Sequence, residues 1–205
     1  MTGKTEAEIG LTTARLETLT DGVFAIAMTL LVLNLKLPLT GKGVTERELE
    51  AIIYGQFNLF FNYFLSFILL ALFWMLHHQQ FHYFRKTDRS HIWINIFILM
   101  FVALIPFSAS LVGTFAHAKL DEFFFALNMF IIGSLFFLNW IYATNQHRLV
   151  DAELSTQRIA VGRRRALVLP VVSLTATATV VINPAWSGYI YLLIPFILWL
   201  PSFRR

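Results

Sequence analysis

RLETLTDGVFAIAMTLLVLNLKLP, from Arg15 to Pro38, is the stretch around which the rest of the chain is organised. It opens with charged and hydroxyl residues and then continues from position 22 to position 39 with few polar interruptions. At about 1.5 Å of rise per residue, that run is just long enough to cross a bilayer as a helix. The helix is expected to begin at Thr20 and Asp21. A short side-chain oxygen caps free backbone N–H groups, and a carboxylate suits the positive end of a helix.

The composition identifies an integral membrane protein with several spans. Of 205 residues, 57% are hydrophobic and 14% are charged, whereas soluble domains carry about 25% charged residues. The mean hydropathy is +0.65. The absence of cysteine excludes disulfides, thiolate metal sites and a cysteine nucleophile. The polar N-terminus lacks the short apolar core of a signal peptide, so the first apolar run is expected to remain as a spanning helix.

The apolar runs predict an all-α integral membrane protein with six transmembrane helices in one domain, residues 1–205. The second run is too long for one crossing, so its ends are expected to project or the helix to tilt. Pro106, Pro170 and Pro195 are expected to bend their helices. The predicted spans are Asp21–Leu39, a segment within Leu49–Phe84, Ile92–Phe115, Phe123–Thr144, Ala166–Ile182 and Trp186–Phe203.

The distribution of lysine and arginine predicts the orientation. With both termini on the cytoplasmic side, twelve of the 16 basic residues lie inside and four lie outside, which satisfies the positive-inside rule. The four outside are Lys36, Lys42, Arg47 and Lys119. The protein is therefore expected to be a multi-pass protein of the plasma membrane. Its net charge of +4 is explained by this topology, so a nucleic-acid partner is not expected.

Several classes of function lack their sequence signals. The spans carry no acidic residue away from the cytoplasmic edge, and neither a TVGYG-type filter nor paired repeats with broken helices are visible. No P-loop, nucleophile elbow or HExxH motif is present, so an enzyme is not expected. His78 and His82 have the i, i+4 spacing of a metal pair but no supporting carboxylate nearby, so no metal or cofactor is expected.

At 100° per residue, the first helix carries an aliphatic stripe on one narrow face, with Phe24 on the opposite side. On spacing alone, such a stripe is most often a helix contact. The alternative is a hydrophobic constriction around a symmetry axis, which controls ion passage by its diameter and by dewetting. The stripe comprises Gly22, Ile26, Leu30, Leu33 and Leu37, with Thr29 at its edge.

Polar residues gather at the cytoplasmic end of the same helix. Arg15, Glu17, Thr20 and Asp21 can be read as a cap with surface ion pairs, which contribute little. They can also be read as a buried network that fixes the angle of this helix against its neighbours. His77, near the end of the second apolar run, is expected to hydrogen-bond to this group. The asparagines within the spans are expected to join helices.

RLETLTD followed by GVFAIAMTLLVL resembles the signature that opens each repeat of the endolysosomal potassium channel called transmembrane protein 175, and particularly its single-repeat bacterial relatives. That signature is Arg, three residues, then Phe-Ser-Asp before an Ile/Leu-rich pore helix. Arg15 and Asp21 match it, while Leu19 and Thr20 replace the Phe and the Ser. FWMLHHQQFHYF, Asp88 and the Phe101–Phe107 stretch also resemble the family, and the similarity covers the first half of the chain.

The resemblance implies a homotetramer of six-helix subunits whose first helices line a central pore that conducts potassium and other monovalent cations. By position, Ile26, Leu30 and Leu33 would constrict the pore and Thr29 would face it. The anchoring network would comprise Arg15, Thr20, Asp21, Trp74 and His77. Aliphatic rings offer no replacement ligands, so only modest potassium selectivity is expected. The competing interpretation is a small secondary transporter of cationic or hydrophobic solutes, which would form a monomer or an antiparallel dimer.

Overall fold

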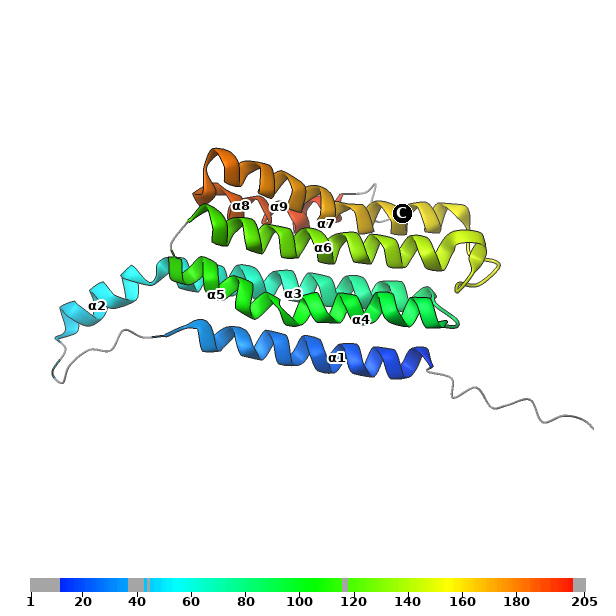
Figure 1. Cartoon of the computed structure of the whole chain (residues 1–205), viewed down its shortest axis with the longest axis horizontal. Helices are drawn as coiled ribbons and strands as arrows, with labels where there is room; N and C mark the ends of the chain where they lie inside the picture. The colour runs from blue at the N-terminus through cyan, green and yellow to red at the C-terminus, as the bar shows by residue number, and fades with distance from the viewer. Residues whose placement is uncertain (1–11, 37–42, 44, 116–117, 201–205) are drawn as a thin grey trace, which may run out of the picture.

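The computed structural model describes residues 12–36, 43, 45–115 and 118–200, and these form an elongated bundle of helices (Figure 1). The predicted all-α membrane class is confirmed. Five helical segments are long and apolar enough to cross a membrane, and a shorter apolar segment, Pro184–Trp199, stands in the sixth position. The helices are α1 Thr13–Leu30, η1 Leu31–Asn34, α2 Glu46–Gly55, α3 Phe57–Tyr83, α4 Arg89–Ala103, α5 Ile105–Phe115, α6 Lys119–Thr144, η2 Asn145–His147, α7 Thr156–Ile182, η3 Pro184–Trp186, α8 Ser187–Ile190 and α9 Leu193–Trp199.

The first helix begins earlier than its sequence suggests. Thr12 is the N-cap, and its side chain accepts a hydrogen bond from the Arg15 backbone N–H at 3.4 Å. The prediction that Thr20 and Asp21 cap the helix is therefore wrong, since both lie within it. Residues 13–20 extend the helix before its apolar part, because Thr12 satisfies a free N–H group nearly three turns before the apolar run begins.

The outer end of this helix changes its winding. The α-helix ends at Leu30 and a 3₁₀ turn follows over Leu31–Asn34. The Asn34 side-chain amide donates to the Pro106 carbonyl at 2.8 Å, which ties the turn to the start of α5. The predicted continuation of the span to Leu39 lies outside the described residues.

The long second run divides into two helices. Gln56 ends α2 and precedes α3, and its side-chain amide donates to the Lys36 carbonyl at 3.1 Å. Helix α2 has a capping box of Thr45 and Glu48, buries no residue and projects from the end of the bundle (Figure 1). The expected projection of this run is thus produced by a break in the helix.

Prolines shape the later helices unequally. The third run breaks at Leu104, between α4 and α5, because Pro106 lacks an N–H and disfavours helical backbone before it. Pro170 lies inside α7, which nevertheless remains one helix. The sixth run is divided among η3, α8 and α9, and Phe203 lies outside the described residues.

The helices lie in successive layers, with α1 on one side, α3, α4 and α5 next, then α6, and α7 to α9 on the far side (Figure 1). Helices α6 and α7 approach closely at glycines. A Cβ built on Gly133 would lie 2.8 Å from the Pro170 backbone nitrogen, and one on Gly162 would overlap the Trp140 ring. This tight pair forms a rigid support for the inner layer and, through it, for α1.

Candidate functional site

One side of α1 packs into the subunit and the other is left uncovered. Phe24 is 1% exposed and packs in the core, as expected for the side opposite the stripe. Ile26, Leu30 and Leu33 are 60%, 42% and 64% exposed. An aliphatic surface of this kind needs a lipid, a second copy of the chain or a confined pathway against it. Leu37, the last member of the predicted stripe, lies outside the described residues.

Two small or polar residues interrupt the exposed aliphatic face. A Cβ built on Gly22 would meet no atom within 4 Å, so the stripe begins beside open space. Thr29 is exposed, and its hydroxyl donates to the Ile26 carbonyl at 2.8 Å. Because the hydroxyl hydrogen is used within the helix, the Thr29 oxygen presents lone pairs to its surroundings. The face is thus aliphatic, with the Thr29 hydroxyl oxygen as a hydrogen-bond acceptor on it.

The inner part of α1 is joined to α3 by two hydrogen bonds. The Trp74 indole N–H donates to Asp21 Oδ1 at 2.8 Å, and Thr20 Oγ1 lies 3.4 Å from His77 Nε2. Thr20 is fully buried and His77 is nearly so. These bonds come from residues three apart on the same side of α3, and therefore resist rotation of α1 about its own axis. The structure thus brings together four of the five residues predicted to anchor this helix.

Arg15, the fifth predicted anchor, is exposed, and its side chain makes no hydrogen bond or ion pair with any residue in the described ranges. It lies more than one turn before Thr20 on α1. Within one subunit, Arg15 is therefore separate from the network that holds this helix.

The contacts of His77 extend into a buried chain of amides. His77 Nε2 lies 3.2 Å from Asn95 Oδ1, and Asn95 Nδ2 donates to Asn139 Oδ1 at 3.0 Å. Asn139 Nδ2 donates to Gln80 Oε1 at 2.9 Å, and Gln80 Nε2 donates to the Phe136 carbonyl at 3.0 Å. The chain links α1, α3, α4 and α6, and all five of its side chains from Thr20 to Gln80 are buried.

The direction of this chain follows from its last member. The Phe136 carbonyl can only accept, so the amide NH₂ of Gln80 faces it and the amide oxygen of Gln80 faces Asn139. By the same argument, the NH₂ of Asn139 faces Gln80 and the NH₂ of Asn95 faces Asn139. The Asn95 oxygen therefore faces His77 and requires a donor there. His77 Nε2 therefore carries a hydrogen, which the Thr20 oxygen also approaches. Sequence reasoning assigned the asparagines to helix joining but missed Gln80 and the continuity of the chain.

A second polar cluster clamps the loop between α3 and α4. Asp88 Oδ1 accepts from the His91 backbone N–H at 2.9 Å, and Oδ2 accepts from the Tyr142 hydroxyl at 2.7 Å. Arg148 donates to the same hydroxyl at 2.9 Å and lies over the Tyr142 ring. Partial burial opposes ionisation of Asp88, but the bonds from His91 and Tyr142 and the nearby Arg148 prevail and lower its pKa. This carboxylate therefore stays charged and holds α4 to α6.

No ligand constellation stands out beside these clusters. His78 stacks on Trp74, and the described part of the chain contains no group of three histidine, aspartate or glutamate side chains suited to a metal ion. The arrangement is instead a helix with one uncovered aliphatic face, whose orientation is fixed from behind by hydrogen bonds.

Comparison with known proteins yields a consistent set of similarities. A family model described as endosomal/lysosomal potassium channel TMEM175 matches residues 15–106. A potassium channel of Streptomyces collinus is 30% identical over 156 residues, which cover 74% of each chain. The human endosomal/lysosomal proton channel TMEM175 is 35% identical over 118 residues, covering 55% of this chain but 23% of that protein. The crystal structure of a lysosomal potassium-selective channel TMEM175 homologue from Chamaesiphon minutus has a TM-score of 0.79 at 25% identity, covering 93% of this chain and 97% of that one.

Proposed function

This chain belongs to the TMEM175 family of channels, and on that premise we propose that it forms a potassium-selective cation channel whose pore is lined by α1. The observation that carries the proposal is the uncovered aliphatic stripe on α1, with Ile26 and Leu33 more than half exposed and Phe24 buried behind them. In a homotetramer, four such faces would surround one axis. Each subunit then contributes its own rigid support behind its pore helix.

The proposed mechanism is passage through rings of aliphatic side chains. Ile26, Leu30 and Leu33 form successive constrictions, while Gly22 leaves a wider mouth and Thr29 offers an oxygen between rings. An ion that enters an apolar ring sheds part of its hydration shell, and potassium holds its water less tightly than sodium does. Since the rings supply no replacement carbonyl ligands, selectivity for potassium is modest.

In this mechanism the hydrogen bonds of Asp21 and Thr20 set the angle of the pore helix. Trp74 and His77 hold α1 from behind, and the buried amides transmit that support to α6. A small rotation of α1 would move Ile26 away from the axis and change the diameter of the ring. Arg15 would join this network only through a neighbouring subunit. By the positive-inside argument, this end of α1 faces the cytoplasm. The location proposed for the protein is the plasma membrane.

The test is the flux of potassium against sodium through the purified protein in liposomes, with wild type beside Ile26→Asn. The variant places a polar amide in the first of the proposed aliphatic rings, so potassium preference is expected to fall and conductance to rise. Leu174→Asn is the matched control, because Leu174 is 59% exposed on α7, away from α1. Its flux ratio is expected to equal that of wild type.

Two outcomes would count against the proposal. An unchanged ratio in Ile26→Asn would remove Ile26 as the filter and leave Leu30 or Leu33. Absence of flux from a folded monomer or antiparallel dimer would instead favour a small transporter of cationic or hydrophobic solutes. Measuring the mass of the assembly alongside the flux separates the two.

A further inference from the structure

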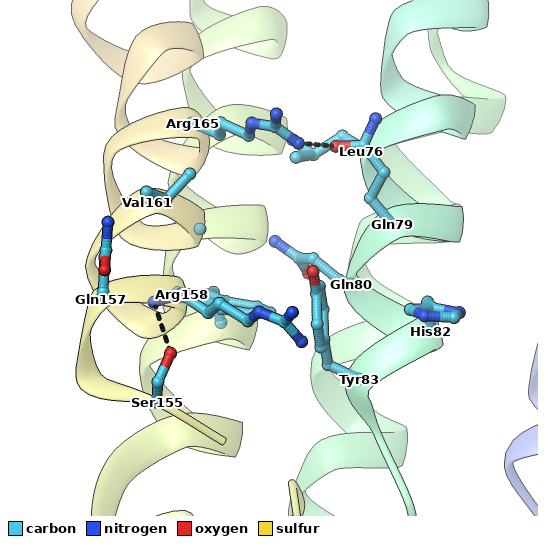
Figure 2. Close-up of a pocket in the computed structure, with 12 residues that line it drawn as sticks. Leu76, Gln79, Gln80, His82, Tyr83, Ser155, Gln157, Arg158, Val161 and Arg165 are labelled. Carbon is cyan, nitrogen blue, oxygen red and sulfur yellow. Dashed lines mark hydrogen bonds between the residues drawn. The ribbon is translucent and has the colours of Figure 1, made fainter. Parts of the chain in front are cut away.

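A polar pocket opens between the end of α3 and the start of α7, at the end of the bundle where α1 begins (Figure 2). Its volume is about 710 Å³. Figure 2 shows Arg158 and Arg165 reaching from α7 toward α3, where Arg165 donates to Gln79 Oε1 at 2.8 Å. Its polar lining consists of Gln79, Gln80, His82, Tyr83, Ser155, Gln157, Arg158 and Arg165.

The lining of this pocket is cationic. It contains two arginines and no carboxylate among its described residues. The Arg158 guanidinium makes no hydrogen bond or ion pair with another described residue. Arg158 also lines an adjoining hollow that contains Asp151 and Glu153, and there Asp151 lies 3.8 Å from Arg85. The pocket therefore suits an anion with several oxygen acceptors.

An apolar groove of about 280 Å³ continues from the polar pocket. The two share Leu76, Gln79 and Arg165 in their walls. Met75, at the side of the groove, is 48% exposed, so the groove opens to the flank of the bundle. Its other lining residues are Leu72, Val168, Leu169, Ile194, Pro195, Leu198 and Trp199, from α3, α7 and α9.

The position of these two hollows matches the layers of a bilayer. From Ile182 at the far end of α7 back to Arg165 is about 25 Å of helix, close to the roughly 30 Å thickness of the hydrocarbon core. Arg165 therefore lies near the boundary of the core. Arg158 lies about 10 Å further along the same helix, at the level of the headgroups. The apolar groove descends from that boundary into the core.

We propose that the pocket and groove together bind one anionic phospholipid, with its phosphate between Arg158 and Arg165 and an acyl chain along the groove. The continuity of a cationic headgroup site with an apolar groove at this depth favours a lipid over a free anion, which would use only the upper half. The bound lipid would bridge α3 and α7. Binding of this lipid does not require that the protein conduct ions.

The test measures lipid binding to the purified full-length protein by native mass spectrometry, with phosphatidylglycerol and phosphatidylcholine of identical acyl chains. Wild type is expected to retain phosphatidylglycerol preferentially. Arg158→Gln with Arg165→Gln is expected to weaken that binding by about tenfold or more, because two charge-assisted contacts are lost. Arg89→Gln with Arg163→Gln makes the same change in net charge at the same end of the bundle, on exposed residues outside the pocket, and is expected to bind as wild type does.

Two further variants test the headgroup site and the acyl-chain groove separately. Arg158→Gln alone spares the contact of Arg165 with Gln79, so it tests the headgroup site if the double variant does not fold. Met75→Trp fills the groove and is expected to weaken phosphatidylglycerol binding while leaving the arginines in place. Equal phosphatidylglycerol binding by the pocket and control variants would overturn the proposal. Displacement of the lipid by glycerol 3-phosphate, with no effect of Met75→Trp, would overturn it in favour of a free-anion site.

Discussion

Replacing Asn95 with alanine tests whether the buried amides support the pore helix. Asn95 is fully buried at the centre of the chain, between His77 on α3 and Asn139 on α6. Its Nδ2 also donates to the His91 carbonyl at 2.8 Å within α4. Asn95→Ala therefore removes both interhelical bonds at once while leaving the helix backbone unchanged.

The expected loss in the free energy of unfolding follows from the buried polar groups that lose their hydrogen-bond partner. Asn139 Oδ1 loses the donor that reaches it, and a buried acceptor left unsatisfied costs about 1–3 kcal/mol. His77 Nε2–H retains only the Thr20 oxygen at 3.4 Å. Interhelical hydrogen bonds in membranes average about 0.6 kcal/mol, which places the total near 2 kcal/mol. For a chain of this size, that corresponds to a fall in Tm of about 4–8 °C.

The assay is thermal unfolding of the purified protein in detergent, with Thr175→Ala as the control. Thr175 is exposed on α7, and its hydroxyl bonds only to its own helix, at the Val171 carbonyl. Its removal is expected to leave Tm nearly unchanged. A double variant with Asn139→Ala should cost less than the sum of the single variants, because both remove the same bond. Equal Tm values for Asn95→Ala and Thr175→Ala, or strict additivity with Asn139→Ala, would refute the reasoning.

Three other predictions follow from single sites. Gly133→Val should destabilise the protein by about 1–3 kcal/mol, measured as a lower Tm, because its Cβ would press on the Pro170 backbone; an unchanged Tm would contradict the close contact. Gly22→Leu should not lower Tm, since its Cβ meets no atom within 4 Å and leucine favours the helix over glycine, but should reduce potassium flux by narrowing the proposed mouth. The lowered pKa of Asp88 means that its carboxylate stabilises the fold above the unfolded pKa of about 3.9 and ceases to do so as pH falls through the lower folded value. The Tm difference between wild type and Asp88→Asn should therefore be present at neutral pH and shrink below about pH 4; a constant difference would show that the hydrogen bond to Tyr142, and not the charge, is responsible.

The sequence permitted prediction of the fold class and of the orientation of α1, because hydropathy and helical periodicity report directly on which faces are apolar. Phe24 was expected opposite the stripe and is buried there. Pro106 correctly indicated a bend in the third span, since proline acts on its own backbone. The roles assigned to Ile26, Thr29, Leu30 and Leu33 remain predictions, as does the homotetramer.

Other features depend on partners that are distant in sequence. The amide chain joins residues 44 and 59 positions apart, and no local pattern indicates which asparagine meets which glutamine. The start of α1 was misplaced because Thr12 and Thr20 are both suitable caps, and the choice depends on how far the helix extends beyond the apolar layer. The break at Gln56 is stabilised by the Lys36 carbonyl, which belongs to another segment.

The 3₁₀ turn at the outer end of α1 sets the rotational register of two aliphatic side chains. A 3₁₀ helix turns by about 120° per residue and an α-helix by about 100°, so over the three steps from Leu30 to Leu33 the first completes a full turn and the second falls about 60° short. Ideal 3₁₀ winding over Leu31–Asn34 therefore places Leu33 directly above Leu30. If this turn relaxed into α-helix, Leu33 would swing sideways by about a sixth of a turn and move about 1.5 Å closer to Leu30. The hydrogen bond from Asn34 to the Pro106 carbonyl, at the end of the turn, thus holds the angular position of Leu33, the outermost described side chain of the stripe.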